Sequence, residues 1–165
     1  MMAISPDEFR AAMQRFPGVV TIVTTSGTGE RLGVTATAVS SVSADPPSLL
    51  VCLNRNTGTC QVVDETGRFN VNLLTEPAGD LAMRFAGAGG VTGEAKFDEG
   101  DWCEDERGLP FLKDALVGFS CDVSERIEAS SHLIFIGEIQ SVRLSEGSPL
   151  LYERSTFRTL GPVAA

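Results

Sequence analysis

Strand-like segments recur along this chain, and most of them are joined by links of hairpin length. Residues 19–25 (VVTIVTT) are β-branched throughout, and the turn SGTG at 26–29 predicts that the chain returns from Arg31 as a hairpin. Because hairpin-linked strands pair antiparallel, and no strand–helix–strand rhythm is present, the sequence predicts an antiparallel barrel rather than a doubly wound parallel sheet. Further strands are expected at 38–44, 48–54, 69–74, 116–127, 132–144 and 150–152.

A helix is expected before the first strand. Its start is the motif SPDE at 5–8, in which a Ser N-cap, a Pro at N1 and a Glu at N3 form a capping box. Phe9, Met13 and Phe16 follow at helical spacing, and Pro17-Gly18 ends the segment.

Two more short helices are expected, at 57–66 and 78–85, and the glycine-rich segment 87–93 is predicted to be a mobile loop. At 165 residues the chain is long enough to bury a core without disulfides or metals. We therefore expect one domain over 1–165, with its core at about 5–160.

Charge and hydropathy exclude several classes of partner. Thirteen Lys and Arg against 22 Asp and Glu give a net charge of -9, and an acidic domain without a basic stripe is not expected to bind nucleic acid or an anionic membrane. No apolar run approaches the ~18–20 residues of a membrane span. The N-terminal sequence MMAISPDEFR lacks the apolar region of a signal peptide, so the expected location is the cytoplasm.

The four cysteines, Cys52, Cys60, Cys103 and Cys121, form no CxxC pair, and no disulfide framework is expected without a secretory signal. Cys52 and Cys121 lie in apolar runs and are interpreted as small buried hydrophobic residues. Together with the single His132 the cysteines are too few and too scattered for a zinc site, so no metal is expected.

The sequence lacks both the dinucleotide-binding fingerprint and the serine-hydrolase motif. Gly27, Gly29 and Gly33 are spaced G-x-G-x-x-x-G with no helix after them, and Gly87 and Gly89 lack the third glycine of a dinucleotide fingerprint. If the protein uses a nicotinamide cofactor, that cofactor is therefore not expected to bind in a Rossmann crevice. A serine hydrolase is not expected either, because G-x-S-x-G does not occur.

His132 stands at the start of a predicted strand. A lone histidine there is more often structural than catalytic, yet strand ends also gather functional residues, so both interpretations stay open. Cys–His nucleophilic catalysis also stays open, although no cysteine is paired with His132 in the sequence. Tyr152 and Phe157, close to Arg154 and Arg158, either close the barrel or lie at the edge of a ligand site.

Residues 33–56, GVTATAVSSVSADPPSLLVCLNRN, are unusually rich in small side chains. Such a segment either packs tightly or lets a flat ligand approach the backbone. Thr57 opens the predicted helix 57–66, whose N-terminal N–H groups favour a phosphate. The composition therefore predicts a flat, phosphorylated, hydrogen-bonding ligand. Its expected side-chain partners are Thr35, Thr37, Ser40, Ser41, Ser43, Asn54, Asn56 and Thr57.

Six motifs follow one another along the chain in the order FPGVVTIVT, GVTATAVSSVSADPPSLLVCLNRNT, FNVNLL, GLPFLKDAL, SHLIFIGE and PLLY. In these motifs and their order, the chain resembles the short-chain flavin reductase family, whose domain is the flavin reductase-like, FMN-binding split barrel. The resemblance covers nearly the whole chain. It implies a mainly β fold, an antiparallel split β-barrel with a few short flanking helices.

The same resemblance implies a flavin site across a dimer interface. The ring edge is expected on the backbone of Thr35–Val42, and His132 is expected near the nicotinamide as the candidate catalytic residue. The candidate cofactor-binding residues are Thr35, Ala36, Thr37, Ala38, Val39, Ser40, Ser41, Val42, Cys52, Asn54, Asn56, Thr57, Phe85, Tyr152 and Phe157. The chain departs from the family at Thr37, where many relatives carry Asn, and at Arg154-Ser155-Thr156, which replaces an Arg-Gly-type turn.

Proteins of this kind are usually homodimers that use NADH or NADPH to reduce FMN or FAD, and the reduced flavin commonly feeds a separate monooxygenase. The resemblance therefore implies a reductase of this class. Two alternatives stay open. One is a non-enzymatic flavin or haem carrier or sensor on the same barrel, and the other is a reductase of another acceptor, such as ferric complexes, with flavin as a relay.

Overall fold

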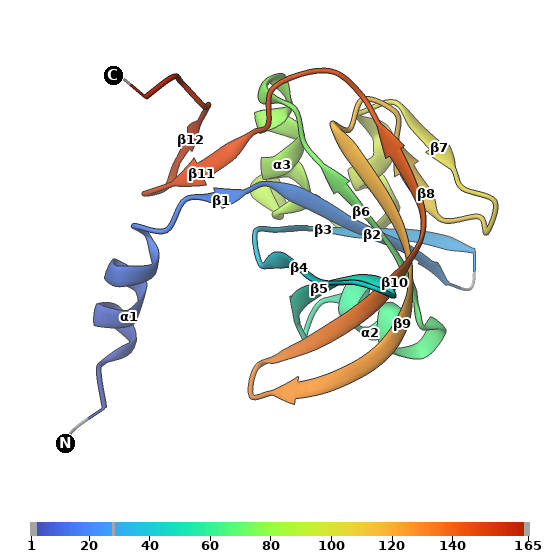
Figure 1. The fold of residues 1–165 in the computed structure, drawn as a ribbon, viewed down its shortest axis with the longest axis horizontal. Helices are drawn as coiled ribbons and strands as arrows, with labels where there is room; N and C mark the ends of the chain where they lie inside the picture. Colours follow the sequence, from blue (N-terminus) through green and yellow to red (C-terminus); the bar gives the residue numbers. More distant parts are fainter. Residues whose placement is uncertain (1–2, 28, 164–165) are drawn as a thin grey trace.

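The computed structural model describes residues 3–27 and 29–163, and it consists mainly of antiparallel strands (Figure 1). One sheet of seven strands runs in the order β3-β2-β6-β9-β10-β5-β4, a smaller one in the order β1-β11-β12, and β7 pairs with β8. The strands are β1 Gly18–Val19, β2 Thr21–Gly27, β3 Glu30–Ala36, β4 Val39–Ala44, β5 Pro47–Asn54, β6 Arg68–Leu73, β7 Trp102–Glu104, β8 Pro110–Leu112, β9 Val117–Ala129, β10 His132–Leu144, β11 Leu151–Glu153 and β12 Thr156–Arg158.

The large sheet is not closed. Its two outer strands are β3 and β4, which are consecutive in the chain, so the barrel is split between them. The predicted mainly β fold, an antiparallel split barrel with a few short helices, is confirmed. The predicted hairpin of β2 with β3 is also confirmed, although Thr28 of its turn lies outside the described residues. Strands β7, β8 and β12, each of three residues, were not predicted.

The first helix, α1 (Pro6–Met13), carries the predicted capping box. Ser5 Oγ accepts a hydrogen bond of 3.2 Å from the Glu8 N–H, and the Glu8 carboxylate accepts one of 2.8 Å from the Ser5 N–H. All of its residues are exposed, and Figure 1 shows α1 standing off the barrel on the side of β11 and β12. The remaining helices are α2 Gly58–Thr66 and α3 Gly79–Phe85, with 3-10 helices η1 Glu76–Ala78, η2 Ala88–Gly90 and η3 Gly93–Asp98.

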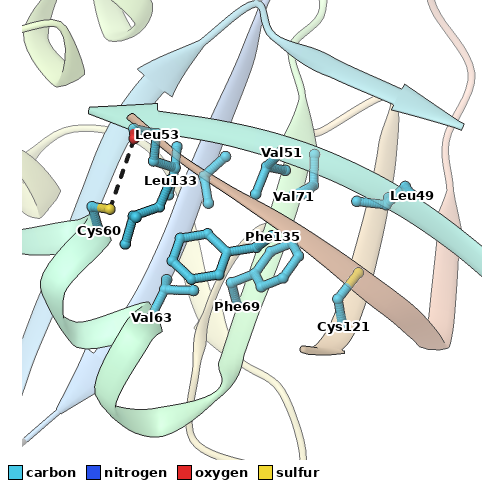
Figure 2. Close-up of a cluster of buried hydrophobic side chains, with 11 residues drawn as sticks. Leu49, Val51, Leu53, Cys60, Val63, Phe69, Val71, Cys121, Leu133 and Phe135 are labelled. Carbon is cyan, nitrogen blue, oxygen red and sulfur yellow. Dashed lines mark hydrogen bonds between the residues drawn. The ribbon is translucent and has the colours of Figure 1, made fainter. Parts of the chain in front are cut away.

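The core divides into two clusters of buried hydrophobic side chains. Phe69 and Phe135 pack inside the barrel against Val63 of α2, and the Cys60 thiol on the same helix donates to the Leu53 carbonyl oxygen over 3.8 Å (Figure 2). The second cluster forms around Phe85, which meets the Phe97 ring edge-on at a centroid distance of 5.0 Å. It ties α3 and η3 to the barrel wall.

One packing prediction was wrong. Cys52 is half-buried, because it alternates along β5 with the buried residues Val51 and Leu53 and so points away from the core. Cys60 and Cys121 are the buried cysteines, and all four thiols are free.

Close packing explains part of the small-residue segment. At Gly33 an added Cβ would lie 2.6 Å from Cε1 of Phe85. No helix in the described part of the chain has both the length and the apolar character needed to cross a membrane.

Candidate functional site

The chain crosses the opening of the split barrel between Thr35 and Val42. Strand β3 ends at Ala36, exposed Thr37 and Ala38 follow, and β4 begins at Val39. Among the described strands β4 pairs with β5 alone, so half of its backbone N–H and C=O groups face the open edge. Ser40, Ser41 and Val42 are exposed there, whereas Ala36 and Val39 are half-buried. The segment therefore offers backbone donors and acceptors to a ligand.

Four of the candidate residues line one cleft of about 270 Å³ between β3, α3 and β11–β12, which we call the β3–α3 cleft. The Tyr152 and Phe157 rings, on residues directly paired between β11 and β12, meet edge-to-face at a centroid distance of 5.4 Å. Thr35 Oγ1 donates a 2.6 Å hydrogen bond to the Ala82 carbonyl, which fixes β3 against α3. The lining residues are Val20, Thr35, Thr37, Ala82, Met83, Ala86, Tyr152 and Phe157.

A second group lies on the outer face of β5 and β10. Asn54 is directly opposite His132, and Cys52 is opposite Ile134. Ser131 Oγ lies 2.9 Å from Nδ1 of His132, so the hydroxyl can hold the ring in place. Burial raises the pKa of the Cys52 thiol, which keeps it protonated near neutral pH and disfavours it as a nucleophile. The Cys–His interpretation therefore gains no support from this pair of strands.

The turn after β5 leads into α2 through local hydrogen bonds. Asn54 Oδ1 accepts from the Asn56 N–H over 2.9 Å, and Thr57 Oγ1 donates to the Asn54 carbonyl over 2.8 Å. Thr57 Oγ1 also accepts from the Cys60 N–H over 3.2 Å, which makes Thr57 the N-cap of α2. Thr57 therefore opens α2, as the sequence predicted, and the first turn of α2 has a fixed direction.

The first turn of α2 faces a cleft of about 280 Å³, which we call the α2 cleft. Lys96 lies at this cleft, and its Nζ donates to the Phe85 carbonyl over 2.9 Å and the Gly33 carbonyl over 3.2 Å. Burial lowers the pKa of the Lys96 amine. Sequence reasoning missed Lys96, because no motif connects it with Thr57. The lining residues are Leu32, Gly33, Val34, Thr57, Gly58, Thr59, Thr92, Gly93 and Lys96.

The structure does not bring all of the candidate residues together. Phe85 is fully buried and its ring contacts other core rings, so it offers no exposed surface to a ligand. Within the described residues of this single chain, His132 is not among those that line the β3–α3 cleft. The candidates therefore form two groups, one beside Tyr152 and one beside His132.

Sequence reasoning also missed a third cleft, of about 340 Å³, between α1 and the β11–β12 turn; we call it the α1 cleft. The predicted stripe of Phe9, Met13 and Phe16 was the available signal, but it was interpreted only as a helix face. The lining residues are Phe9, Arg10, Met13, Gln14, Phe16, Gly18, Thr37, Tyr152, Glu153, Arg154 and Ser155.

No group of three or more His, Cys, Asp or Glu within the described residues is placed to hold a metal ion.

The chain also matches a known protein family and known proteins along most of its length. The family model described as "Flavin reductase like domain" matches residues 13–161. The chain is 38% identical over 157 residues to the reductase component of an FADH(2)-dependent resorcinol hydroxylase from Rhizobium sp. (strain MTP-10005), covering 93% of this chain and 87% of that protein. It is 39% identical over 154 residues to an FMN reductase (NADH) of Agrobacterium fabrum, with the same two coverages of 93% and 87%.

Among solved structures, the chain is similar to the NADH:FAD oxidoreductase SgcE6 of Streptomyces globisporus C-1027. The TM-score is 0.88 at 28% sequence identity, and the alignment covers 100% of this chain and 95% of that one.

Proposed function

This chain belongs to the flavin reductase like domain family, and from that premise we propose that it is a flavin reductase that transfers a hydride from NADH or NADPH to FMN or FAD. The observation that carries the proposal is the family match over residues 13–161, together with relatives of reductase function along nearly their whole length. We further propose that the reduced flavin passes to a separate monooxygenase, as the name of the resorcinol hydroxylase reductase component suggests. We also propose that the protein works in the cytoplasm and that residues 1–165 form a single domain, with its core at about 5–160.

We propose that the flavin ring edge binds along the open edge of β4. The free N–H and C=O groups of this strand match the alternating donors and acceptors of the ring's polar edge. Cys52, Asn54 and Asn56 would hold the ring and ribityl chain, and the first turn of α2, beside Lys96, would hold the phosphate. When bound, the flavin supplies the electron-accepting centre, and the protein supplies position and electrostatics.

The chain's own residues have three proposed roles in the reaction. Backbone N–H groups near Val39–Ser41 stabilise the negative charge that develops on the ring's polar edge. His132, held by the Ser131 hydroxyl, orients the nicotinamide without acting as an obligatory acid or base. Tyr152 and Phe157 exclude water at the rim of the β3–α3 cleft.

We propose that the working form is a homodimer. The Tyr152 and His132 groups are separate within one chain, and a second copy provides the way to combine them. Ile127 and Val42 leave apolar surface exposed on and near the β4–β5–β10–β9 face, with 43% and 48% of each residue exposed. Light scattering coupled to gel filtration tests this proposal, since a monomer at micromolar concentration would contradict it.

The steady-state oxidation of NADH and of NADPH, each with added FMN and FAD, tests the activity. Turnover that depends on free flavin supports a reductase of diffusible flavin. A coloured protein with bound flavin or haem and no turnover would favour a carrier or sensor. Rapid reduction of ferric complexes with only a catalytic amount of flavin present would favour a reductase of another acceptor that uses flavin as a relay. Absence of nicotinamide oxidation with every flavin would overturn the proposed function.

A further inference from the structure

The α1 cleft has the lining chemistry of a nucleotide site. Phe9 and Phe16 present aromatic rings on one side, and Tyr152 presents a third on the other. Flat heterocycles bind well against such rings through stacking. Arg10 and Arg154 also line the cleft, and guanidinium groups are suited to binding phosphate oxygens. Aromatic walls beside two guanidiniums fit a ligand with one flat base and a charged phosphate group.

The ion pairs at this cleft leave its arginines accessible. Arg10 pairs with Asp7 at 2.6 Å, but the two side chains are 67% and 92% exposed, and such surface pairs contribute little. Glu153, the acidic residue of the lining, forms ion pairs with Arg154 at 3.3 Å and with Arg158 at 3.5 Å. The lining therefore carries two guanidiniums, those of Arg10 and Arg154, against one carboxylate, that of Glu153, an excess of positive charge on a chain with a net charge of -9.

The cleft is joined to the proposed reaction site. Thr37 and Tyr152 line both the α1 cleft and the β3–α3 cleft, so one extended ligand can occupy the two together. The helix side of the cleft is fixed through the Arg154 N–H, which donates to the Gln14 carbonyl over 3.0 Å. Every residue of α1 is nevertheless exposed, so the apolar side chains of the helix are available to a bound molecule.

We propose, building on the proposed flavin reductase activity, that the α1 cleft binds the adenosine diphosphate half of a dinucleotide. The adenine lies against Phe9 and Phe16, and the diphosphate is bound by Arg10 and Arg154. FAD and NADH both carry this half, whereas FMN and reduced nicotinamide mononucleotide lack it. The cleft thus discriminates between dinucleotides and mononucleotides, and α1 is a specificity element.

Steady-state kinetics of the Arg10→Glu and Arg154→Gln variants test this assignment. Each variant is assayed with NADH or reduced nicotinamide mononucleotide as the donor, and with FAD or FMN as the acceptor. If the diphosphate is that of NADH, KM for NADH rises about tenfold, while KM for reduced nicotinamide mononucleotide is unchanged. If it is that of FAD, KM for FAD rises by the same factor and KM for FMN is unchanged. ADP should inhibit the wild-type protein competitively with that dinucleotide, and its inhibition constant should rise in both variants.

Arg15→Glu is the matched control, because Arg15 follows α1 closely in the chain but does not line the cleft, and it should leave every KM unchanged. Equal effects on dinucleotides and mononucleotides, or no effect of either variant in an active protein, would overturn the assignment. Absence of turnover in the wild-type protein would instead overturn the proposed function itself, and binding of ADP, followed by calorimetry, would then still test the cleft.

Discussion

His132 lies directly opposite Asn54 in the antiparallel pairing of β10 with β5. The pairing places the imidazole next to the turn that leads to Thr57 and the start of α2. Directly opposed residues in a sheet have their side chains on the same face and within about 5.5 Å at Cβ. A histidine and a polar turn that lie far apart in the sequence thus become neighbours beside the proposed flavin site.

The His132→Ala variant should lower kcat/KM for NADH about tenfold, equivalent to about 1.4 kcal/mol of transition-state stabilisation, because the nicotinamide loses an orienting side chain. Ser131→Ala should have a smaller effect in the same direction, since it removes the hydroxyl 2.9 Å from Nδ1 but keeps the ring. Both are measured by steady-state NADH oxidation. An unchanged kcat/KM in His132→Ala, at unchanged melting temperature, would remove His132 from the site.

The Gly33→Ala variant should destabilise the fold by about 1–3 kcal/mol, because overpacking a buried strand position forces neighbouring side chains out of place. The added Cβ would lie 2.6 Å from Cε1 of Phe85 and 3.3 Å from Cγ2 of Thr24. Urea unfolding measures the change. Gly161→Ala is the matched control, since an added Cβ there meets nothing within 4 Å, and its unfolding free energy should be unaltered.

The segment 33–56 illustrates what sequence reasoning could reach. Its small residues predicted either close packing or a ligand platform, and the structure assigns Gly33 to packing against Phe85. The exposed residues Ser40 and Ser41 remain candidates for the platform. Strands 39–44 and 47–54 were predicted within one residue at each end, because their β-branched and apolar runs are bounded by the double proline.

The clefts were harder to foresee, since each combines elements distant in the chain. Lys96 reaches the α2 cleft only because η3 folds back over β3. Arg10 and Arg154 line the same cleft, although they belong to a helix and a hairpin at opposite ends of the sequence. Strand β12 was missed because its turn has Arg154 and Ser155 at φ 49° and 58°, a conformation that Gly and Asn would normally signal.

The unfolding free energy of the protein should fall as the pH rises above about 9. Burial raises the pKa of the Cys121 thiol from 9.0 to about 12, so between these values the folded state binds more protons than the unfolded state. Stability is then lost as the unfolded thiol ionises, by roughly 1.4 kcal/mol at pH 10 relative to pH 7 from this group. Urea titrations at the two pH values should show a smaller loss in Cys121→Ala than in the wild-type protein. Equal losses in the two proteins would assign the alkaline sensitivity to other groups.

The period-two alternation of FNVNLL at 69–74 predicted a strand, but its two asparagines proved to be as buried as Phe69 and Val71. Asn72 Nδ2 donates to the Ile22 carbonyl over 3.0 Å, and Asn72 Oδ1 accepts from the Leu112 N–H over 2.9 Å, so one side chain links three strands. Asn72→Leu should therefore lower the unfolding free energy by about 1–3 kcal/mol, because the buried Leu112 N–H loses its acceptor. Urea unfolding measures the loss, and Asn56→Ala, at an exposed turn position, should change stability by less than about 0.5 kcal/mol. An Asn72→Leu protein with an unaltered urea midpoint would mean that apolar packing replaces this polar link without loss.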